Sequence, residues 1–140
     1  QPKPSIKPID PELIAKKFKR GIFKAETIEI GADGKREQES AAMCMDEQSS
    51  HMLVFGVLAG VAGCEPLSTR EDKSSIAVTA NCPTTSEMGA NFYSATMRWS
   101  ADGKRIEMES KRVTLEGGRP TDKLLKSLQY KLTHQAASCP

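Results

Sequence analysis

Alternating apolar and polar positions predict β-strands along much of the chain. Residues 22–30 alternate imperfectly, whereas residues 91–99 and 104–116 alternate over longer runs. A period of two residues is typical of a strand with one face buried. We therefore expect a mainly β fold of the α+β class, in which an antiparallel sheet of hairpins is curved or partly closed.

The pentapeptide Ala-Asp-Gly-Lys-Arg occurs twice, at 32–36 and at 101–105. Each copy separates two strand-like runs, and Asp-Gly favours a tight hairpin turn because a type I′ turn needs positive φ at both central residues. The repeat is interpreted as one turn used twice, with an internal duplication or a functional loop as the alternative. The Lys-Arg pair is interpreted as a solvated strand start.

Two helices are predicted among the strands. Asp10 caps a short helix that ends before Gly21, with Leu13, Ile14 and Phe18 on its apolar face. A second helix near 47–60 follows the capping residue Asp46 and is apolar on all sides from Met52 onward, so we expect it to be buried against the sheet or to cover a cavity.

The ends of the chain have their own patterns. Four prolines in the first eleven residues predict an extended, disordered arm over 1–10, followed by a single β-rich domain over 11–140. The C-terminal stretch suits both a helix and a strand, and we expect a turn or short helix near 121–126 before a final strand.

The four cysteines lie at 44, 64, 82 and 139, and none forms a Cys-x-x-Cys pair. Cys64 and Cys82 are equidistant from Lys73, so a hairpin turning at Lys73 brings them opposite each other. That hairpin favours a Cys64–Cys82 disulfide and leaves Cys44 to pair with Cys139, although four cysteines allow three pairings. Four free buried thiols are the alternative.

The balance of charged residues bears on which partners the protein can have. Twenty Lys and Arg oppose eighteen Asp and Glu, and a formal charge of +2 argues against a nucleic-acid partner. Residues 1–24 nevertheless carry seven Lys and Arg against two acidic residues. No apolar run is long enough for a transmembrane segment.

The chain begins with Gln1, as mature exported proteins do and trimmed sequences also do. With the expected disulfides, we predict a periplasmic or secreted protein whose signal peptide is removed.

Several short motifs together resemble the bacterial exported family known as domain of unknown function 3617. They are GIFKAE at 21–26, MCMDEQ at 43–48, GCEP at 63–66, TANCP at 79–83, GANFYSATM at 89–97 and the final cysteine. The chain departs from that family in having Ile22-Phe23 where Leu-Trp is typical, and in its long apolar helix and basic N-terminal helix. The resemblance covers about 21–140 and implies an exported, disulfide-bonded, mainly β domain without an assigned activity.

No motif for catalysis or cofactor binding is present, so we expect no enzyme activity and no cofactor. The two histidines, His51 and His134, lie outside any zinc or nucleophile motif. Met43, Met45, His51 and Met52 offer soft ligands that suit copper, but core packing explains the methionines better.

We therefore predict a non-catalytic binding protein of the bacterial envelope, in particular an inhibitor or immunity protein against an envelope-targeting enzyme or toxin. Its partner would be another envelope protein. The alternative is a carrier or sensor of an apolar small molecule or lipid, and a third is a structural protein without a discrete ligand. The candidate contact residues are Met52, Phe55 and Leu58 on the apolar helix and Lys16, Lys17 and Arg20 on the basic one.

Overall fold

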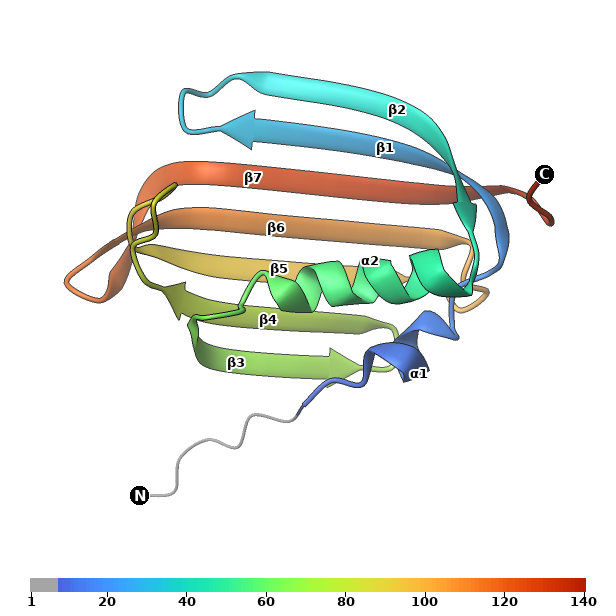
Figure 1. Ribbon diagram of the computed structural model, residues 1–140, viewed down its shortest axis with the longest axis horizontal. Coiled ribbons are helices and arrows are strands. Elements are labelled where there is room, and N and C mark those ends of the chain that lie inside the picture. Colours follow the sequence, from blue (N-terminus) through green and yellow to red (C-terminus); the bar gives the residue numbers. More distant parts are fainter. Residues whose placement is uncertain (1–7) are drawn as a thin grey trace.

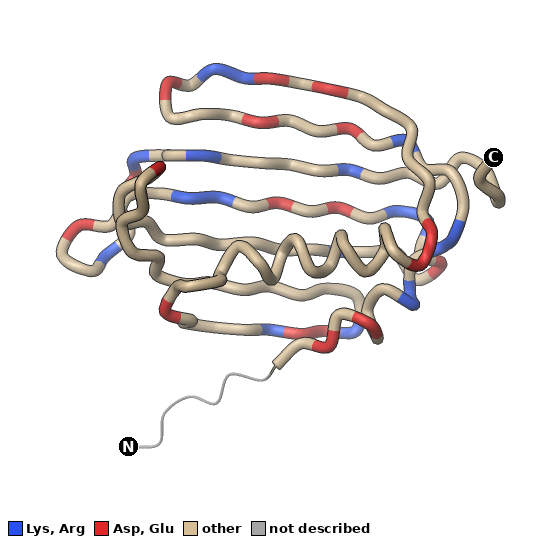
Figure 2. The backbone as a smooth tube through the Cα atoms, in the orientation of Figure 1, with Lys and Arg blue, Asp and Glu red and all other residues tan. Residues whose placement is uncertain are grey.

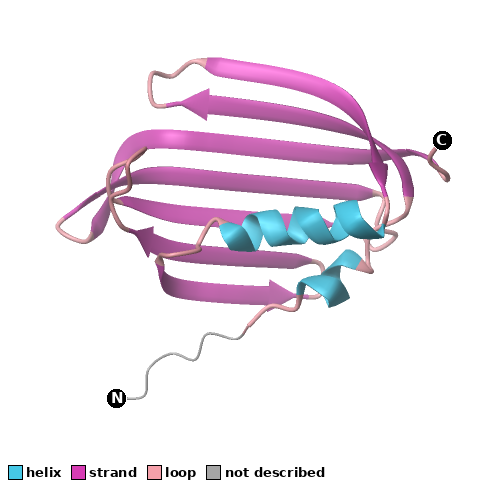
Figure 3. Ribbon diagram, in the orientation of Figure 1, coloured by secondary structure: helices cyan, strands magenta, loops and turns pink. Residues whose placement is uncertain are grey.

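A single antiparallel sheet of seven strands forms the body of the protein, and two helices lie on one of its faces (Figures 1 and 3). The computed structural model describes residues 8–140, so most of the predicted arm over 1–10 lies outside the described residues. The strands are β1 (Gly21–Gly31), β2 (Arg36–Met45), β3 (Glu65–Asp72), β4 (Ser75–Cys82), β5 (Asn91–Trp99), β6 (Arg105–Glu116) and β7 (Arg119–Ala136). The helices are α1 (Pro11–Ala15) and α2 (Glu47–Ala59).

The strand order is β2-β1-β7-β6-β5-β4-β3, and the two edge strands do not pair with each other. The predicted fold class is therefore confirmed, with an open sheet. No helix of the described residues is long and apolar enough to cross a membrane.

The core lies between the helices and the sheet, mainly on β4 and β5, and it also takes in Phe23 of β1, Ile106 of β6 and Leu132 of β7. Strands β4 and β5 bury every second residue on this side, including Ile76, Val78 and Met97. Helix α2 packs Val54 and Val57 into the same core. Beyond the buried end marked by Phe23, Met45 and Leu132, the helices leave β1, β2 and β7 uncovered on this side, and Thr27 and Tyr130 are only half-buried there.

Both copies of the repeated pentapeptide form the tips of β-hairpins, as predicted. Gly34 N–H donates to the carbonyl of Gly31 at 3.0 Å, and Gly103 N–H donates to that of Ser100 at 2.9 Å. The predicted turn type is wrong, because the glycine is the only residue of each turn with positive φ. Each hairpin instead uses a type I turn followed by a left-handed glycine.

Helix α1 is shorter than predicted, because the chain tightens into a turn after Ala15. Phe18 thereby packs edge-to-face on Trp99, with the ring centroids 5.9 Å apart. Ile14 and Phe18 are buried as expected, but Leu13 is 60% exposed and does not belong to the apolar face.

The predicted turn or helix near 121–126 is also wrong, since β7 runs unbroken through this stretch. It pairs with β6 on one side, where Val113 faces Leu124, and with β1 on the other, where Gly31 faces Lys126. Pairing with β6 therefore overrides the local helical pattern.

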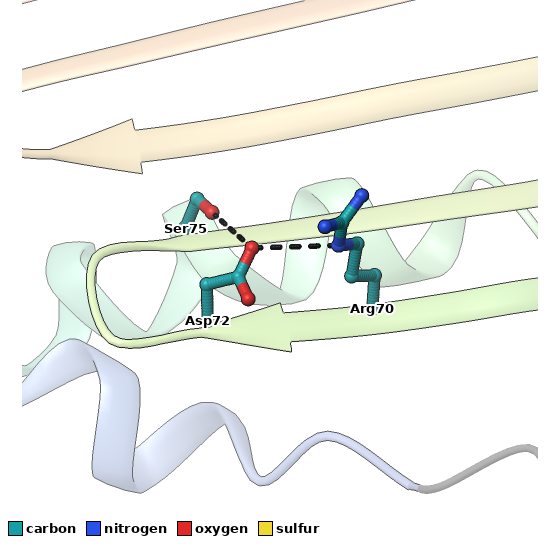
Figure 4. A network of polar contacts seen from close by, with 3 residues as sticks. All are labelled: Arg70, Asp72 and Ser75. Atoms are coloured by element: carbon teal, nitrogen blue, oxygen red, sulfur yellow. Dashed lines mark hydrogen bonds and ion pairs between the residues drawn. The ribbon is translucent and has the colours of Figure 1, made fainter.

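Edge strand β3 is short and polar. Arg70 Nε lies 3.5 Å from Asp72 Oδ2, and the same carboxylate oxygen accepts a hydrogen bond from Ser75 Oγ at 3.4 Å (Figure 4). These side chains are exposed, so the ion pair adds little stability. Charged residues and Pro66 on this edge instead discourage pairing with another strand.

Candidate functional site

Helix α2 is fixed to the sheet by a disulfide on each side of it in the chain. Cys44, just before the helix, is bonded to Cys139, and Cys64, just after it, is bonded to Cys82. Both predicted pairings are confirmed. Together the two disulfides anchor the chain on either side of a helix of 13 residues. The helix is therefore held rigidly in place before any partner binds.

The N-terminus of α2 is closed by a capping box. Ser49 N–H donates to Asp46 Oδ1 at 2.8 Å, and Asp46 N–H donates to Ser49 Oγ at 2.8 Å. The hydrogen bond from the backbone of Ser49 is the largest cause that lowers the pKa of Asp46 below its ordinary value. Asp46 thus acts as the cap that the sequence predicts.

The other end of α2 is held by Arg112 of β6. Its guanidinium donates to the carbonyl of Gly60 at 3.0 Å and to Asn91 Oδ1 at 2.8 Å, and it lies 4.3 Å from the centre of the Tyr93 ring. Tyr93 Oη donates to the carbonyl of Val57 at 3.3 Å, and burial raises the pKa of this phenol. These contacts use carbonyls that the last turn of a helix leaves without partners.

The face of α2 that points away from the sheet is apolar. Met52 is 61% exposed and Phe55 is 53% exposed, and Gly56 and Ala59 are exposed beside them. The spacing of these four residues places them on one side of the helix. We call this surface the α2 stripe. The helix packs against the sheet as expected, and only its face with Ser50, Val54 and Val57 is buried.

The sequence-predicted contact residues do not all meet. Met52 and Phe55 share the α2 stripe, whereas Leu58 is half-buried and lines a separate hollow of about 190 Å³ against β3 and β4. Lys16 and Lys17 are exposed after α1, and Arg20 is half-buried. Lys17 Nζ lies 5.5 Å from the centre of the Trp99 ring and donates to the carbonyl of Lys73 at 3.3 Å, so it helps to dock α1.

A small apolar groove runs between α2 and the uncovered part of the sheet. It has a volume of about 80 Å³ and is bordered by Gly56, Val57, Tyr93, Met108, Leu128 and Tyr130. Sites for small molecules have volumes of about 300 Å³ or more. The groove is therefore too small for a lipid, and this weakens the hypothesis that the protein carries a lipid.

The opposite face of the sheet has a larger hollow of about 370 Å³. Its border includes three carboxylates, Glu26, Glu107 and Glu109, and two cations, Arg98 and Lys131. Arg98 is paired with Glu107 at 3.4 Å, with both side chains largely exposed. Charged side chains of both signs therefore border this hollow, and it does not suit an apolar ligand.

The histidines and methionines considered for metal binding do not lie together in one site, and His134 makes other contacts. His134 Nε2 lies 3.1 Å from the carbonyl oxygen of Arg20, and its ring stands edge-on to Phe23. Met45 is buried in the core, whereas Met52 faces solvent, so the candidate copper ligands do not face one site. Within residues 8–140, no group of three or more His, Cys, Asp and Glu could hold a metal ion.

Sequence patterns find the stripe only in part. They indicate an apolar helix but not which of its faces stays in solvent. Arg112 was missed altogether, since it lies in a run of charged and alternating residues that predicts a solvated strand. A local signal is the neighbouring Val113, where the alternation of apolar positions set by Ile106 and Met108 changes phase.

Comparison of the chain with protein-family models, with curated proteins and with solved structures found no match, so the resemblance described above stays a prediction.

Proposed function

We propose that the protein is a non-catalytic binding module of the bacterial envelope that holds a partner protein against the α2 stripe. The observation that carries this proposal is that Met52 and Phe55 stay in solvent on a helix anchored at both ends by disulfides. Large apolar side chains that share one exposed surface are typical of interaction sites.

The geometry suits a partner with a shallow apolar groove. A helix that lays residues i, i+3, i+4 and i+7 into such a groove is a common mode of protein recognition. Phe55 and Met52 would fill pockets of the partner, while Gly56 and Ala59 would let the two backbones approach closely. Because α2 is already ordered and anchored, binding would cost little conformational entropy.

The finer proposal is that the partner is an enzyme or toxin that acts on the cell envelope and that binding inhibits it. A small scaffold held by two disulfides is suited to an oxidising compartment where such targets act. It offers a rigid surface that a catalytic cleft or its rim can receive. Inhibition would follow from covering that cleft, without chemistry by this protein.

Native mass spectrometry of the tagged protein, recovered from the periplasm of its own source, tests the first step. A stoichiometric complex with one protein is expected. A bound mass of lipid size would favour the carrier alternative, and a bare chain under gentle conditions would argue against a stable partner.

The decisive experiment uses the purified partner and measures affinity and inhibition. The M52Q/F55Q variant should weaken binding by at least tenfold, since truncated central contacts dominate such interfaces. Leu13→Gln is the matched control, because Leu13 is as exposed as Met52 but lies on α1. Equal affinities for M52Q/F55Q and the unchanged protein would place the interface elsewhere and overturn the proposal.

A further inference from the structure

Five cations from two distant stretches of the chain meet at one end of the sheet, where Figure 2 shows blue and red segments side by side. They are Lys19, Arg20, Lys24, Lys104 and Arg105, and we call them the cationic end. The antiparallel pairing puts the starts of β1 and β6 beside the end of β7. Positions that are far apart in the sequence thereby become neighbours.

Residues Thr133 and His134 of β7 lie at the centre of this cluster. In the sheet register, Thr133 has Lys24 of β1 on one side and Arg105 of β6 on the other. His134 N–H donates to the carbonyl of Lys104 at 2.9 Å, and its Nε2 lies 3.1 Å from the carbonyl oxygen of Arg20. Lys19 N–H donates to the carbonyl of Gly103 at 3.0 Å, which brings Lys19 beside Lys104.

Among the described residues, none of these five cations is held in an ion pair, although the Arg20 guanidinium donates to the carbonyl of Ala15 at 3.4 Å. The ion pairs of residues 8–140 are Arg70–Asp72, Arg98–Glu107 and Lys126–Glu29, and none of them includes a member of the cationic end. The nearby carboxylates of Asp46 and Asp102 accept hydrogen bonds from backbone N–H groups of their own turns and stay negatively charged. They offset two of the five cations, so the cationic end keeps an excess of positive charge that attracts anions.

An exposed apolar side chain lies at the same end. Helix α1 lies there (Figure 1), with Leu13 60% exposed and Lys16 exposed one turn later. Basic residues beside a projecting leucine suit the boundary of a bilayer, where phosphates meet the cations and acyl chains meet the leucine. An acidic protein could pair with the cations, but it offers no general site for the leucine.

We propose that the cationic end docks the protein on the surface of an anionic phospholipid bilayer. Lys19, Arg20, Lys24, Lys104 and Arg105 contact lipid phosphates, and Leu13 enters the boundary between headgroups and acyl chains. This contact is independent of the α2 stripe. It would hold the domain at a membrane while a partner protein is bound.

Flotation with extruded vesicles tests the proposal. One set contains 30% phosphatidylglycerol in phosphatidylcholine, and the other contains phosphatidylcholine alone, both in 50 mM salt. Each cation near an anionic surface contributes about fivefold to partitioning, so K104E/R105E should lose about 25-fold or more on the anionic vesicles. Leu13→Gln should lose about tenfold. Binding should vanish in 1 M salt, where the screening length is about 3 Å.

The repeated pentapeptide supplies a matched control. K35E/R36E makes the same substitutions after the same turn and changes the net charge equally, but at the opposite end of the sheet (Figure 2). We expect it to lose less than about threefold. Melting curves check that both variants stay folded, and M52Q/F55Q should bind vesicles like the unchanged protein.

The other outcomes overturn the proposal. Absence of binding to anionic vesicles in 50 mM salt would show that the cationic end has a different partner, such as an acidic protein. Equal losses in the two charge-reversed variants would mean that net charge alone drives association. Equal binding to both kinds of vesicle would show that the cations are not used.

Discussion

The backbone N–H of Lys19 donates to the carbonyl of Gly103 at 3.0 Å, and this bond distinguishes the two copies of Ala-Asp-Gly-Lys-Arg. The turn of the second copy is the surface on which the chain after α1 lies. The turn of the first copy, at Gly34, is exposed, and a Cβ at Gly34 would meet nothing within 4 Å. One local sequence therefore has two tertiary environments.

We predict that Gly103→Ala is far more destabilising than Gly34→Ala. Both glycines have left-handed backbones, with φ of 71° and 81°, so alanine costs about 1 kcal/mol at either position. A Cβ at Gly103 would also lie 2.2 Å from the carbonyl oxygen of Lys17, whereas a Cβ at Gly34 meets nothing within 4 Å. Overpacking adds about 1–3 kcal/mol to the loss at Gly103.

Urea unfolding of the two variants measures this difference. A loss at Gly103 that exceeds the loss at Gly34 by less than about 0.5 kcal/mol would show that the segment after α1 moves away freely. That result would also weaken the placement of Lys19 in the cationic end.

How far the sequence predicts the fold depends on the range of the interaction involved. Asp33-Gly34 and Asp102-Gly103 indicate hairpins because turn chemistry is local. The type of turn depends on one φ angle, which the dipeptide alone does not determine, and here Asp33 and Asp102 keep negative φ. The extended conformation of the stretch 121–126 was missed for the opposite reason, since pairing with β6, a strand close by in space, imposes it.

The glycines of α2 give a second pair of matched variants. Gly60 has φ of −61°, and a Cβ there would lie 2.4 Å from the Tyr93 ring. A Cβ at Gly56 meets nothing within 4 Å. We expect Gly60→Ala to destabilise the fold by about 1–3 kcal/mol through overpacking. Gly56→Ala should stabilise it by about 0.5–1 kcal/mol through helix propensity.

Thermal unfolding followed by circular dichroism compares these variants. Opposite shifts in melting temperature are expected, and shifts of the same sign would contradict the close approach of α2 to Tyr93. Gly56→Ala has a further use, because Gly56 belongs to the α2 stripe. A partner that needs close backbone approach should bind this more stable variant less tightly.

Removal of the two disulfides should have unequal effects. In the chain-entropy model, the Cys64–Cys82 bridge with a separation of 18 residues contributes about 3 kcal/mol. The Cys44–Cys139 bridge spans 95 residues and contributes about 4.7 kcal/mol. C44S/C139S should therefore lose about 1.5 kcal/mol more than C64S/C82S in denaturant unfolding. The reverse order would mean that strain or residual structure outweighs loop length.

The candidate site is harder to predict than the sheet. The disulfide pairing follows from a hairpin and an even number of cysteines, so spacing alone favours it. The α2 stripe depends on the rotation of the helix about its axis, and Met52 and Val54 look equally suited to the core. The cationic end depends on strand order, which brings Lys24 and Arg105 to either side of Thr133.

Acid should weaken the fold partly through Asp46 and Asp102. Hydrogen bonds lower the pKa of both carboxyls below the ordinary value of 3.8, from the Ser49 backbone at Asp46 and from the Ser100 hydroxyl at Asp102. A carboxyl whose pKa is lower in the folded state stabilises the fold above its unfolded pKa. That contribution disappears as the pH falls through the lower folded value.

The test compares melting temperatures at pH 7 and pH 2.5 for the unchanged protein and for D46N/D102N. Asparagine keeps an acceptor oxygen at each turn but does not titrate, so the variant should be less stable at pH 7 and lose less on acidification. D46N and D102N as single variants should each show part of the effect, because the two turns have no shared partners. An equal acid-induced drop in the unchanged protein and D46N/D102N would mean that neither carboxylate is stabilised by folding.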